Sequence, residues 1–250
     1  MEQKTQIIKE KEYKIFFYHE VSSTQDIARK IIHKGEEKNF VVIAERQIAG
    51  RGRGKRRWFS PSGGLYLSIG IPWSGNMQKG LSFLSSWAVA KSIEEVTSII
   101  PQVKWPNDIL VEKKKVAGVL LEKVDIKKFS LAGIGVNVNS QEEDFPLFLR
   151  EKVVSLKDIL GREIYMELFL NTLLKNFFHN LKLLKERGFS YILSKWLEFS
   201  FPLGEPITFH FASNIIEGFY WGVGKEGELY LRTLEGKILS FEEGEIAVDG

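Results

Sequence analysis

The spacing of apolar residues changes along this chain, and the changes restrict which elements each part can form. Between residues 41 and 138, most apolar runs are short and rich in β-branched residues, a pattern that favours strands. One longer stretch there, residues 80–100, has apolar residues at helical spacing and ends at Pro101. Residues 153–199 keep the helical period. Beyond residues 201–204, Phe-Pro-Leu-Gly, short runs separated by glycine-bearing turns predict a small barrel of about five strands.

The N-terminal part adds one helix to this plan. Residues 22–24, Ser-Ser-Thr, are N-cap candidates for a helix with apolar residues on one face, and Gly35 closes it. In the first 200 residues we predict strands at 41–44, 65–71, 109–112, 116–122 and 129–138, the third and fourth forming a hairpin with its turn at residues 113–114. The barrel runs lie at 206–211, 215–223, 229–232, 237–241 and 245–248. We therefore predict two domains, residues 1–200 and residues 201–250.

Composition excludes several classes of protein. The chain has 250 residues, 44% of them apolar, enough for a large domain and a small one. Its net charge of +3 is the small difference between 35 basic and 32 acidic residues, which argues against a global basic field for wrapping nucleic acid. The absence of cysteine excludes disulfides and thiolate chemistry. The polar N-terminus lacks a signal sequence and no apolar run reaches membrane-spanning length, so we expect a cytoplasmic protein with no membrane partner.

A basic loop, residues 47–58, follows an apolar run and carries five cations among three glycines. Glycine lets the backbone approach a ligand closely, and Arg51 and Arg53 supply forked donors that suit carboxylate and phosphate, so we expect a site for an anion. Two alternatives stay open, a nucleic-acid tether of the RGG kind and a solvated charge run without a ligand. The loop is not a P-loop, because the glycine spacing from Gly50 is one residue short and Arg56 stands where a P-loop has Ser or Thr.

Two further segments combine polar side chains with strand-like surroundings. Residues 104–108, Lys-Trp-Pro-Asn-Asp, place an amide, a carboxylate and an aromatic ring in a turn fixed by proline. The Trp-Pro pair could simply anchor the core, whereas Asn107 could bind the edge of a base, since an amide both donates and accepts. Residues 133–139 alternate glycine with larger residues. They fit either an ordinary strand or a floor on which a ligand lies against the backbone, with Asn137 at its rim.

Three lysines follow the first of these segments. Lys113 and Lys114 lie at the tip of the expected hairpin, where a solvated turn is the simpler explanation. Lys115 differs because it begins the strand Lys-Val-Ala-Gly, and strand side chains there can point inward. Lys115 is therefore a candidate site residue.

Taken together, these motifs resemble those of the biotin protein ligase family, in the family's order and at about its spacing, over about residues 15–140. The residues that carry the resemblance are Ser23 and Thr24, residues 50–53, Trp58, residues 104–108, residues 115–118 and residues 135–137. The resemblance implies an α/β (α+β) catalytic domain with a mixed sheet and flanking helices, followed by a small SH3-like β-barrel. The coarse pattern of elements agrees with that fold.

The resemblance also implies a two-step reaction that uses biotin and ATP. The biotin carboxylate attacks the α-phosphate of ATP and gives biotinyl-5'-AMP and pyrophosphate. A lysine of a biotin carboxyl carrier protein, such as the acetyl-CoA carboxylase subunit, then takes the biotinyl group. Fixed cations must balance the charge that develops at the reacting phosphate, and Mg²⁺ would screen the leaving pyrophosphate.

The same resemblance implies three groups of site residues. The catalytic cations are Lys115, Arg51 and Arg53. The biotin site takes Ser23, Thr24, Gln25, Gln47, Gly50, Arg51, Gly52, Arg53, Lys115 and Gly118. The ATP and adenylate site takes Arg53, Trp58, Asn107, Lys115 and Asn137. Asp108 is a weak candidate for a metal ligand, because its position in the sequence is nearest to where one would be expected.

The basic loop is expected to become ordered when ligand binds.

The chain departs from the family pattern at two positions. Gln25 stands where the family often has asparagine, which leaves the contact of Gln25 open. Lys55 stands where the family often has a further glycine, which affects loop mobility and leaves Arg51 and Arg53 in register. Some relatives carry an N-terminal helix-turn-helix domain. Only about fifteen residues precede the apolar run at residues 15–17, so we expect no sequence-specific DNA binding.

Other interpretations compete with this one. A lipoyl or octanoyl ligase or transferase would use the same fold and acyl chemistry on a longer apolar substrate. A nucleic-acid-binding module, using the basic loop and the terminal barrel, would bind with a steep salt dependence and ignore biotin. A catalytically inactive regulatory homologue is disfavoured because the expected cations are all present. An exposed sheet edge could also pair two copies of the chain into a homodimer.

Overall fold

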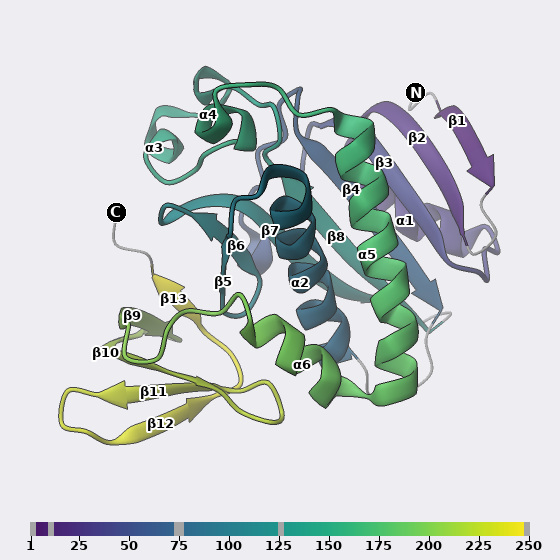
Figure 1. Cartoon of the computed structure of the whole chain (residues 1–250). Coiled ribbons are helices and arrows are strands. Elements are labelled where there is room, and N and C mark those ends of the chain that lie inside the picture. Colours follow the sequence, from purple (N-terminus) through teal and green to yellow (C-terminus); the bar gives the residue numbers. More distant parts are fainter. Residues whose placement is uncertain (1–3, 10–12, 73–77, 125–127, 248–250) are drawn as a thin grey trace.

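A mixed sheet of eight strands dominates the computed structural model, which describes residues 4–9, 13–72, 78–124 and 128–247 (Figure 1). The strand order is β1-β2-β3-β4-β8-β7-β6-β5. The strands are β1 (Lys4–Lys9), β2 (Lys14–Val21), β3 (Phe40–Gln47), β4 (Leu65–Pro72), β5 (Gln102–Lys104), β6 (Asp108–Val111), β7 (Lys114–Val124) and β8 (Phe129–Val136). β2 and β3 run parallel, and the other neighbours run antiparallel. The mixed sheet expected from the sequence is therefore confirmed.

Helices cover both faces of this sheet. They are α1 (Thr24–His33), α2 (Gln78–Thr97), α3 (Leu147–Arg150), α4 (Leu156–Leu160), α5 (Met166–Arg187) and α6 (Phe189–Leu197). In Figure 1, α2 and α5 lie together over one face, and α1 lies behind the sheet. Gly80 permits the close approach of α2 to α5, because a Cβ atom at residue 80 would lie 2.8 Å from Cδ1 of Leu184.

Alternation along β3 explains why both faces are apolar. Val41 and Ile43 belong to the core that includes α2 and α5, whereas Phe40, Val42 and Ala44 belong to a second core that includes α1. Strand side chains point alternately to the two faces, so a continuous apolar run suits a strand that is covered on both sides. The strand predicted at residues 41–44 is confirmed, and β3 extends beyond it to Gln47.

A second sheet of five antiparallel strands follows the helices. Its strands are β9 (Pro206–Phe211), β10 (Asn214–Val223), β11 (Leu229–Thr233), β12 (Ile238–Phe241) and β13 (Glu245–Ala247), in the order β12-β11-β10-β9-β13. All five apolar runs expected at the C-terminal end are strands. Within the residues that the structure describes, β13 pairs with β9 and β12 pairs with β11, without a pairing between β12 and β13 that would close a barrel.

Trp105 joins the two sheets. Its side chain is 2% exposed, and its indole Nε1 donates a hydrogen bond of 3.0 Å to the carbonyl oxygen of Gly227. The indole also packs against Phe209, with ring centroids 6.1 Å apart. Next to it, Lys104 Nζ donates to the carbonyl oxygen of Ile246 at 2.9 Å. Trp105 is thus a core anchor, one of the two interpretations of its motif, and Lys104 beside it connects β5 with β13.

Several local features differ from the sequence-based prediction. β1, the three-residue β5 and the four-residue α3 were not predicted. The hairpin turn between β6 and β7 lies one residue earlier than predicted, at Glu112 and Lys113, whose φ angles are 52° and 63°. A two-residue hairpin turn of this kind requires positive φ at both central residues. The helical region divides into α4, α5 and α6 at Gly161 and Gly188, which also have positive φ.

Candidate active site

A cavity of about 1190 Å³ gathers side chains from the start of α1, the end of β3, the basic loop, β6, β7, β8 and β13. The predicted site residues that line it are Ser23, Thr24, Gln25, Gln47, Arg51, Gly52, Arg53, Trp58, Asn107, Asp108, Lys115, Gly118 and Asn137. Gly50, also predicted, is not in the lining and lies at the base of the loop, where a Cβ atom would be 2.6 Å from the Trp58 carbonyl oxygen. Motifs that are far apart in the sequence therefore meet around one space.

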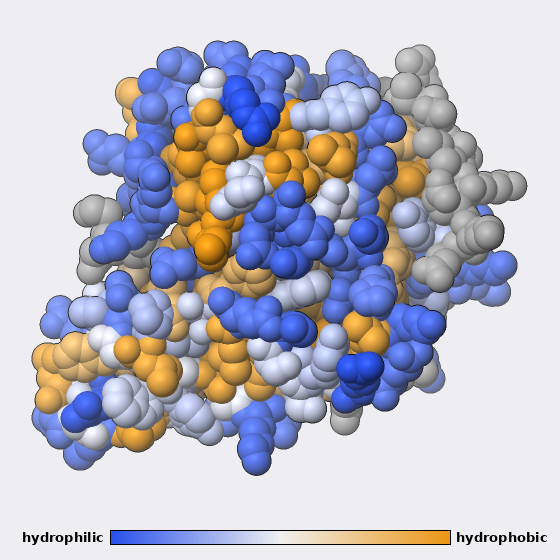
Figure 2. All heavy atoms as spheres, in the orientation of Figure 1, coloured by the Kyte–Doolittle hydropathy of each residue, from blue (hydrophilic) through white to orange (hydrophobic). Residues whose placement is uncertain are grey.

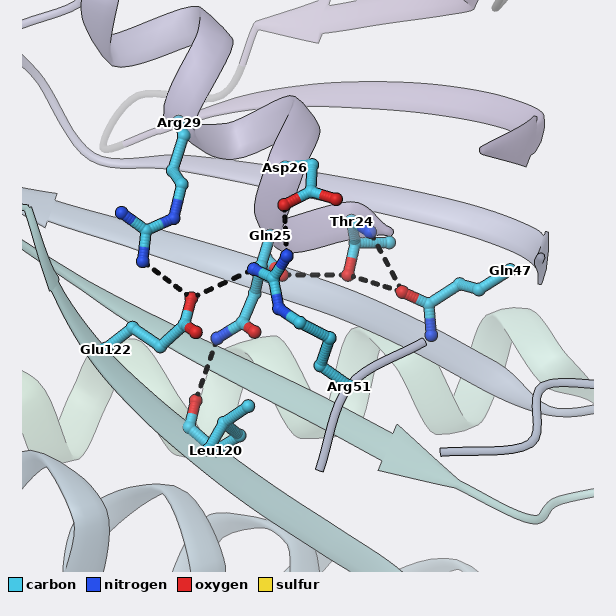
Figure 3. Close-up of polar contacts among 9 residues, drawn as sticks. Thr24, Gln25, Asp26, Arg29, Gln47, Arg51, Leu120 and Glu122 are labelled. Atoms are coloured by element: carbon cyan, nitrogen blue, oxygen red, sulfur yellow. Dashed lines mark hydrogen bonds and ion pairs between the residues drawn. The ribbon is translucent and has the colours of Figure 1, made fainter. Parts of the chain in front are cut away.

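Gln47 organises the polar end of the cavity (Figure 3). Its Oε1 accepts hydrogen bonds from the backbone N–H of Thr24 at 2.8 Å and from Thr24 Oγ1 at 3.1 Å. Its Nε2 donates to Ser60 Oγ at 2.8 Å. Thr24 Oγ1 also lies 2.8 Å from Ser68 Oγ. Ser23 is the N-cap residue of α1 and is buried. Because each group is held by another, this end presents amides and hydroxyls in fixed orientations.

Gln25 lies beside this cluster. Its Nε2 donates a hydrogen bond of 3.0 Å to the carbonyl oxygen of Leu120 on β7. Its side chain also covers Gly133 of β8, where a Cβ atom would lie 2.8 Å from Nε2. The glutamine, one methylene longer than asparagine, therefore spans from α1 to β7 across a glycine of β8.

Two lysines and one aspartate form an ionic group in the middle of the cavity. Lys115 Nζ lies 2.6 Å from Asp108 Oδ1, and Lys104 Nζ lies 3.1 Å from Asp108 Oδ2. The Lys104 and Asp108 side chains are each 8% exposed, whereas that of Lys115 is 31% exposed. Burial by itself would raise the pKa of Asp108, but the two lysines outweigh it and hold the pKa below its ordinary value. The group therefore keeps one net positive charge, which Lys115 presents to the cavity.

Trp58 lies against two glycines at the floor of the cavity. A Cβ atom at Gly118 would be 2.9 Å from Trp58 Cζ3, and one at Gly135 would be 2.5 Å from Cε2 and Nε1. Lys115 Nζ lies 5.2 Å from the centroid of the same ring. The glycines of β7 and β8 thus provide a floor on which a flat group lies against the backbone. This was one of the two interpretations of the glycine-rich segment.

The two predicted asparagines differ in the hydrogen bonds that their side-chain amides make. Asn107 Nδ2 donates to the carbonyl oxygen of Val119 at 2.6 Å. Asn137 is 1% exposed, and its Nδ2 makes two longer contacts, 3.4 Å to Val154 O and 3.5 Å to Lys115 O. Its Oδ1 is buried and has no hydrogen-bond partner among the described residues. Asn137 therefore retains an acceptor within the lining of the cavity.

The basic loop itself folds as a short hairpin. The Trp58 N–H donates to the Gly50 carbonyl at 2.9 Å, and the Gly52 N–H donates to the Arg56 carbonyl at 2.7 Å. A turn of 3₁₀ helix, η1 (Arg53–Lys55), forms the tip, where Gly54 has a φ of 64°. Glycine adopts this left-handed conformation without the strain that a side chain would cause. The expectation that the loop orders on ligand binding stays a prediction.

The hairpin is attached to the rest of the molecule at its tip and near its base. At the tip, Arg53 Nη1 donates to the Gly244 carbonyl at 2.7 Å, and Arg56 Nη1 lies 2.7 Å from Glu245 Oε2. Near the base, the Arg51 guanidinium contacts the carboxylates of Asp26 and Glu122 (Figure 3). These two attachments connect the loop with the C-terminal sheet on one side and with α1 and β7 on the other.

Comparisons with known proteins agree with this arrangement. A family model described as the biotin/lipoate A/B protein ligase family matches residues 17–139. The bifunctional ligase/repressor BirA of Bacillus subtilis is 34% identical over 226 residues, which are 88% of this chain and 70% of the relative. The biotin–[acetyl-CoA-carboxylase] ligase of Paracoccus denitrificans is 31% identical over 78% of this chain and 85% of the relative. The chain belongs to the biotin protein ligase family.

Solved structures of this family share the complete architecture. The biotin protein ligase from Aquifex aeolicus in complex with biotin and ATP superposes with a TM-score of 0.81 at 31% identity, covering 93% of this chain and 97% of that one. A second structure of the Aquifex aeolicus protein, without ligand, gives a TM-score of 0.77 at 28% identity. The likeness extends over both sheets, so it includes the C-terminal strands, which carry few sequence motifs.

Several residues of this ligase-family cavity were not identified from the sequence. Glu245 and His210 line it from the C-terminal sheet, and Asp26 and Glu122 hold the loop. Glu122 had a detectable signal, because it follows Gly118 at a spacing of four on β7 and thus shares its face. Glu245 and His210 had none, since their sheet is placed by long-range packing.

Two sequence-based expectations concern metal and membrane. In the part of the chain that the structure describes, no group of three or more histidines, aspartates or glutamates is placed to hold a metal ion. None of the described helices combines the length and the apolar character that a membrane span needs.

Proposed function

We propose that this chain activates biotin with ATP as biotinyl-5'-AMP and transfers the biotinyl group to a lysine of a biotin carboxyl carrier protein. One observation carries the proposal. A single cavity joins the fixed amides and hydroxyls around Gln47 to the Lys115–Asp108–Lys104 group, in a chain of the biotin protein ligase family. A polar end followed by a cation held in place by Asp108 suits a ligand with a ureido ring at one end and a carboxylate at the other.

At the polar end, Ser23, Thr24 and Gln47 bind the ureido edge of biotin. A ureido group offers one carbonyl acceptor and two N–H donors, and amides with hydroxyls can match both kinds of group. Gln25 adds a further amide beside them and acts with Gly118 and Gly52 as part of the biotin wall. Gly50 acts indirectly, by letting the loop hairpin close at its base.

Lys115 is the catalytic cation. In the first step, a biotin carboxylate oxygen bonds to the α-phosphorus of ATP, the bond to the bridging oxygen breaks, and pyrophosphate leaves. Negative charge then grows on the non-bridging oxygens in a site that contains little water, where a fixed ammonium is most effective. Asp108 orients the Lys115 ammonium, and Lys104 balances Asp108, so that the positive charge of Lys115 remains available. Arg53, near the tip of the loop, adds a second cation.

The nucleotide is held by an aromatic ring and two amides. Trp58 covers the adenylate, and Asn107 and Asn137 contact the adenine, for which the free Oδ1 of Asn137 is the stronger support. An unpaired buried acceptor is costly, and a donor such as the adenine amino group would satisfy it. In the second step, the carrier lysine attacks the biotinyl carbonyl and AMP leaves.

The described residues do not fit a resident Mg²⁺ site. Both oxygens of Asp108 contact lysine ammonium groups, and the described ranges contain no group of three or more histidines, aspartates or glutamates placed to hold a metal ion. A hard cation requires several oxygen ligands, which the phosphates of ATP would have to supply. We therefore assign no catalytic step to a protein-held metal.

Four further properties belong to the same proposal. The carrier domain is the protein partner, and the enzyme works in the cytoplasm. Residues 1–200 form the catalytic domain and residues 201–250 an SH3-like domain, although one apolar core continues across the boundary through Phe209 and Leu231. A homodimer through an edge of the eight-stranded sheet is the proposed assembly.

Mass spectrometry of an acceptor tests the transfer. The purified chain is incubated with biotin, ATP, Mg²⁺ and a biotin carboxyl carrier domain, and the carrier should gain one biotinyl group on its acceptor lysine. A carrier with that lysine changed to arginine is the control and should gain nothing. An unmodified wild-type carrier in the presence of demonstrated adenylate formation would show that the proposed acceptor class is wrong.

A further inference from the structure

Arg51 is held by two carboxylates from different elements (Figure 3). Its Nη1 contacts Asp26 Oδ1 in the first turn of α1, and its Nη2 donates to Glu122 Oε2 on β7 at 3.2 Å. Both terminal nitrogens of the guanidinium are thus directed to protein acceptors. A fork held in this way has a fixed position and orientation.

Arg29 completes the group. It lies one turn after Asp26 on α1, and its Nη2 donates to the same Glu122 Oε2 at 3.0 Å. The four side chains of Asp26, Arg29, Arg51 and Glu122, which we call the Arg51 clamp, carry two positive and two negative charges. The charge of Arg51 is therefore balanced where it lies, whereas the group around Lys115 keeps one positive charge.

The Arg51 clamp acts on the loop through the hairpin backbone. Arg51 forms an isolated bridge with Arg57, next to the rung that joins Gly50 to Trp58. Holding Arg51 therefore also holds the strand of the hairpin that carries Trp58. The tip has a separate attachment through Arg56 and Glu245. At the base, the backbone N–H groups of Ile48 and Ala49 donate to the carbonyl oxygens of Val21 and Ser22, and the Arg51 clamp adds side-chain contacts to α1 and β7.

We propose that Asp26 and Glu122 are positioning residues that hold Arg51, and through it the base of the basic loop, over the cavity. The structural part of this assignment, that the two carboxylates hold the loop, depends only on the contacts described above. The effect on catalysis rests on the proposed function. The family resemblance implied that Arg51 is a catalytic cation. Under this proposal Arg51 instead keeps the loop closed over the adenylate, while Lys115 and Arg53 supply charge to the phosphate.

Two isosteric variants, Asp26→Asn and Glu122→Gln, test the structural part without any substrate. Loss of the charged partner should make the loop open more often, so limited trypsin should cleave after Arg56 or Arg57 about fivefold faster. Arg29→Gln leaves both contacts of Arg51 in place and should cleave at the wild-type rate. Glu94→Gln, which removes an ion pair with Lys91 on α2, is the matched control. Wild-type cleavage of both Asp26→Asn and Glu122→Gln would overturn the proposal.

The effect of the Arg51 clamp on catalysis is tested by two rates, which are measured separately. They are the rate at which biotinyl-adenylate is released and the rate at which it forms. Asp26→Asn and Glu122→Gln should each release adenylate about fivefold faster, with adenylation at saturating biotin and ATP within about threefold of wild type. Combining Asp26→Asn with Arg51→Gln should add little, because both remove the same contact. A loss of adenylation of about a hundredfold in Arg51→Gln alone would instead make Arg51 a catalytic cation and refute its positioning role.

The two readouts separate this proposal from the proposed function. Faster cleavage in a protein that forms no adenylate would keep the Arg51 clamp and reject the ligase chemistry. Normal cleavage in a protein that does form adenylate would reject the clamp alone.

Discussion

The Trp58 indole lies so close to Gly135 that a methyl group at residue 135 would come within 2.5 Å of ring atoms Cε2 and Nε1. No real Cβ contact is that short, so Gly135→Ala must move the ring. We expect the Michaelis constant for ATP to rise about tenfold, because a displaced aromatic cover no longer fits the nucleotide. Steady-state kinetics measure this. In a Trp58→Ala background the same glycine change should have a much smaller effect, and an equal effect in both backgrounds would refute the contact.

Lys115→Ala should slow the first reaction step strongly. Removing the ammonium leaves the charge that develops on the phosphate without its nearest cation, which typically costs about 10² to 10³ in rate. Rapid-quench measurement of adenylate formation at saturating biotin and ATP isolates this step. Lys114→Ala, at the exposed neighbouring position, is the control and should react normally. An unchanged rate in Lys115→Ala would remove Lys115 from the catalytic role.

Asp108→Asn should destabilise the fold and change how stability depends on pH. The substitution leaves the buried Lys104 ammonium without its carboxylate partner, which costs about 3–5 kcal/mol in the free energy of unfolding. The pKa of Asp108 is lowered in the folded state, so the aspartate stabilises the fold above its ordinary pKa of 3.8. That contribution is lost as the pH falls through the lower, folded-state pKa. Urea unfolding from pH 3 to pH 7 should therefore show that the free energy of unfolding depends less on pH in Asp108→Asn than in the wild type. The same pH dependence in both proteins would contradict the lowered pKa of Asp108.

A pair of tryptophan substitutions tests how the two sheets are joined. Trp105→Phe removes the hydrogen bond to the Gly227 carbonyl, whereas Trp87→Phe removes a buried indole N–H that has no partner among the described residues. Both substitutions shrink a buried side chain by the same amount, so their difference isolates the hydrogen bond. We expect Trp105→Phe to lose about 1–2 kcal/mol more unfolding free energy than Trp87→Phe. Equal losses in urea unfolding would show that the indole bond does not stabilise the junction.

The parts of the fold that follow from local pattern could be predicted from the sequence. β3 and β4 are continuous apolar runs, and α1 has an amphipathic face with a glycine after its end. β5 could not be predicted, because three residues carry no periodicity and this strand exists through pairing with β6. The parallel pairing of β2 with β3 is likewise a tertiary result, since it requires α1 to cross behind the sheet.

The candidate site shows the same division. Lys115 could be identified because side chains at the start of its strand can point inward, and Asp108 and Trp58 because they lie in motifs that resemble those of the biotin protein ligase family. Their mutual arrangement could not, since the contact of Lys104 with Asp108 and the position of Trp58 over Gly135 depend on how three strands stack. Glu245 could not be identified as a site residue from the sequence. Its place at the loop tip is set by the docking of the C-terminal sheet, for which single-sequence patterns give no signal.

Exchange of labelled pyrophosphate into ATP tests the central claim most directly. Purified protein is assayed with biotin, with lipoate and with neither, because the family model covers ligases for both acids. The proposed function predicts exchange with biotin alone, and no exchange above background in the other two reactions. Exchange with lipoate and not with biotin would contradict the substrate assignment, and the absence of exchange in all three reactions would contradict the adenylation chemistry itself.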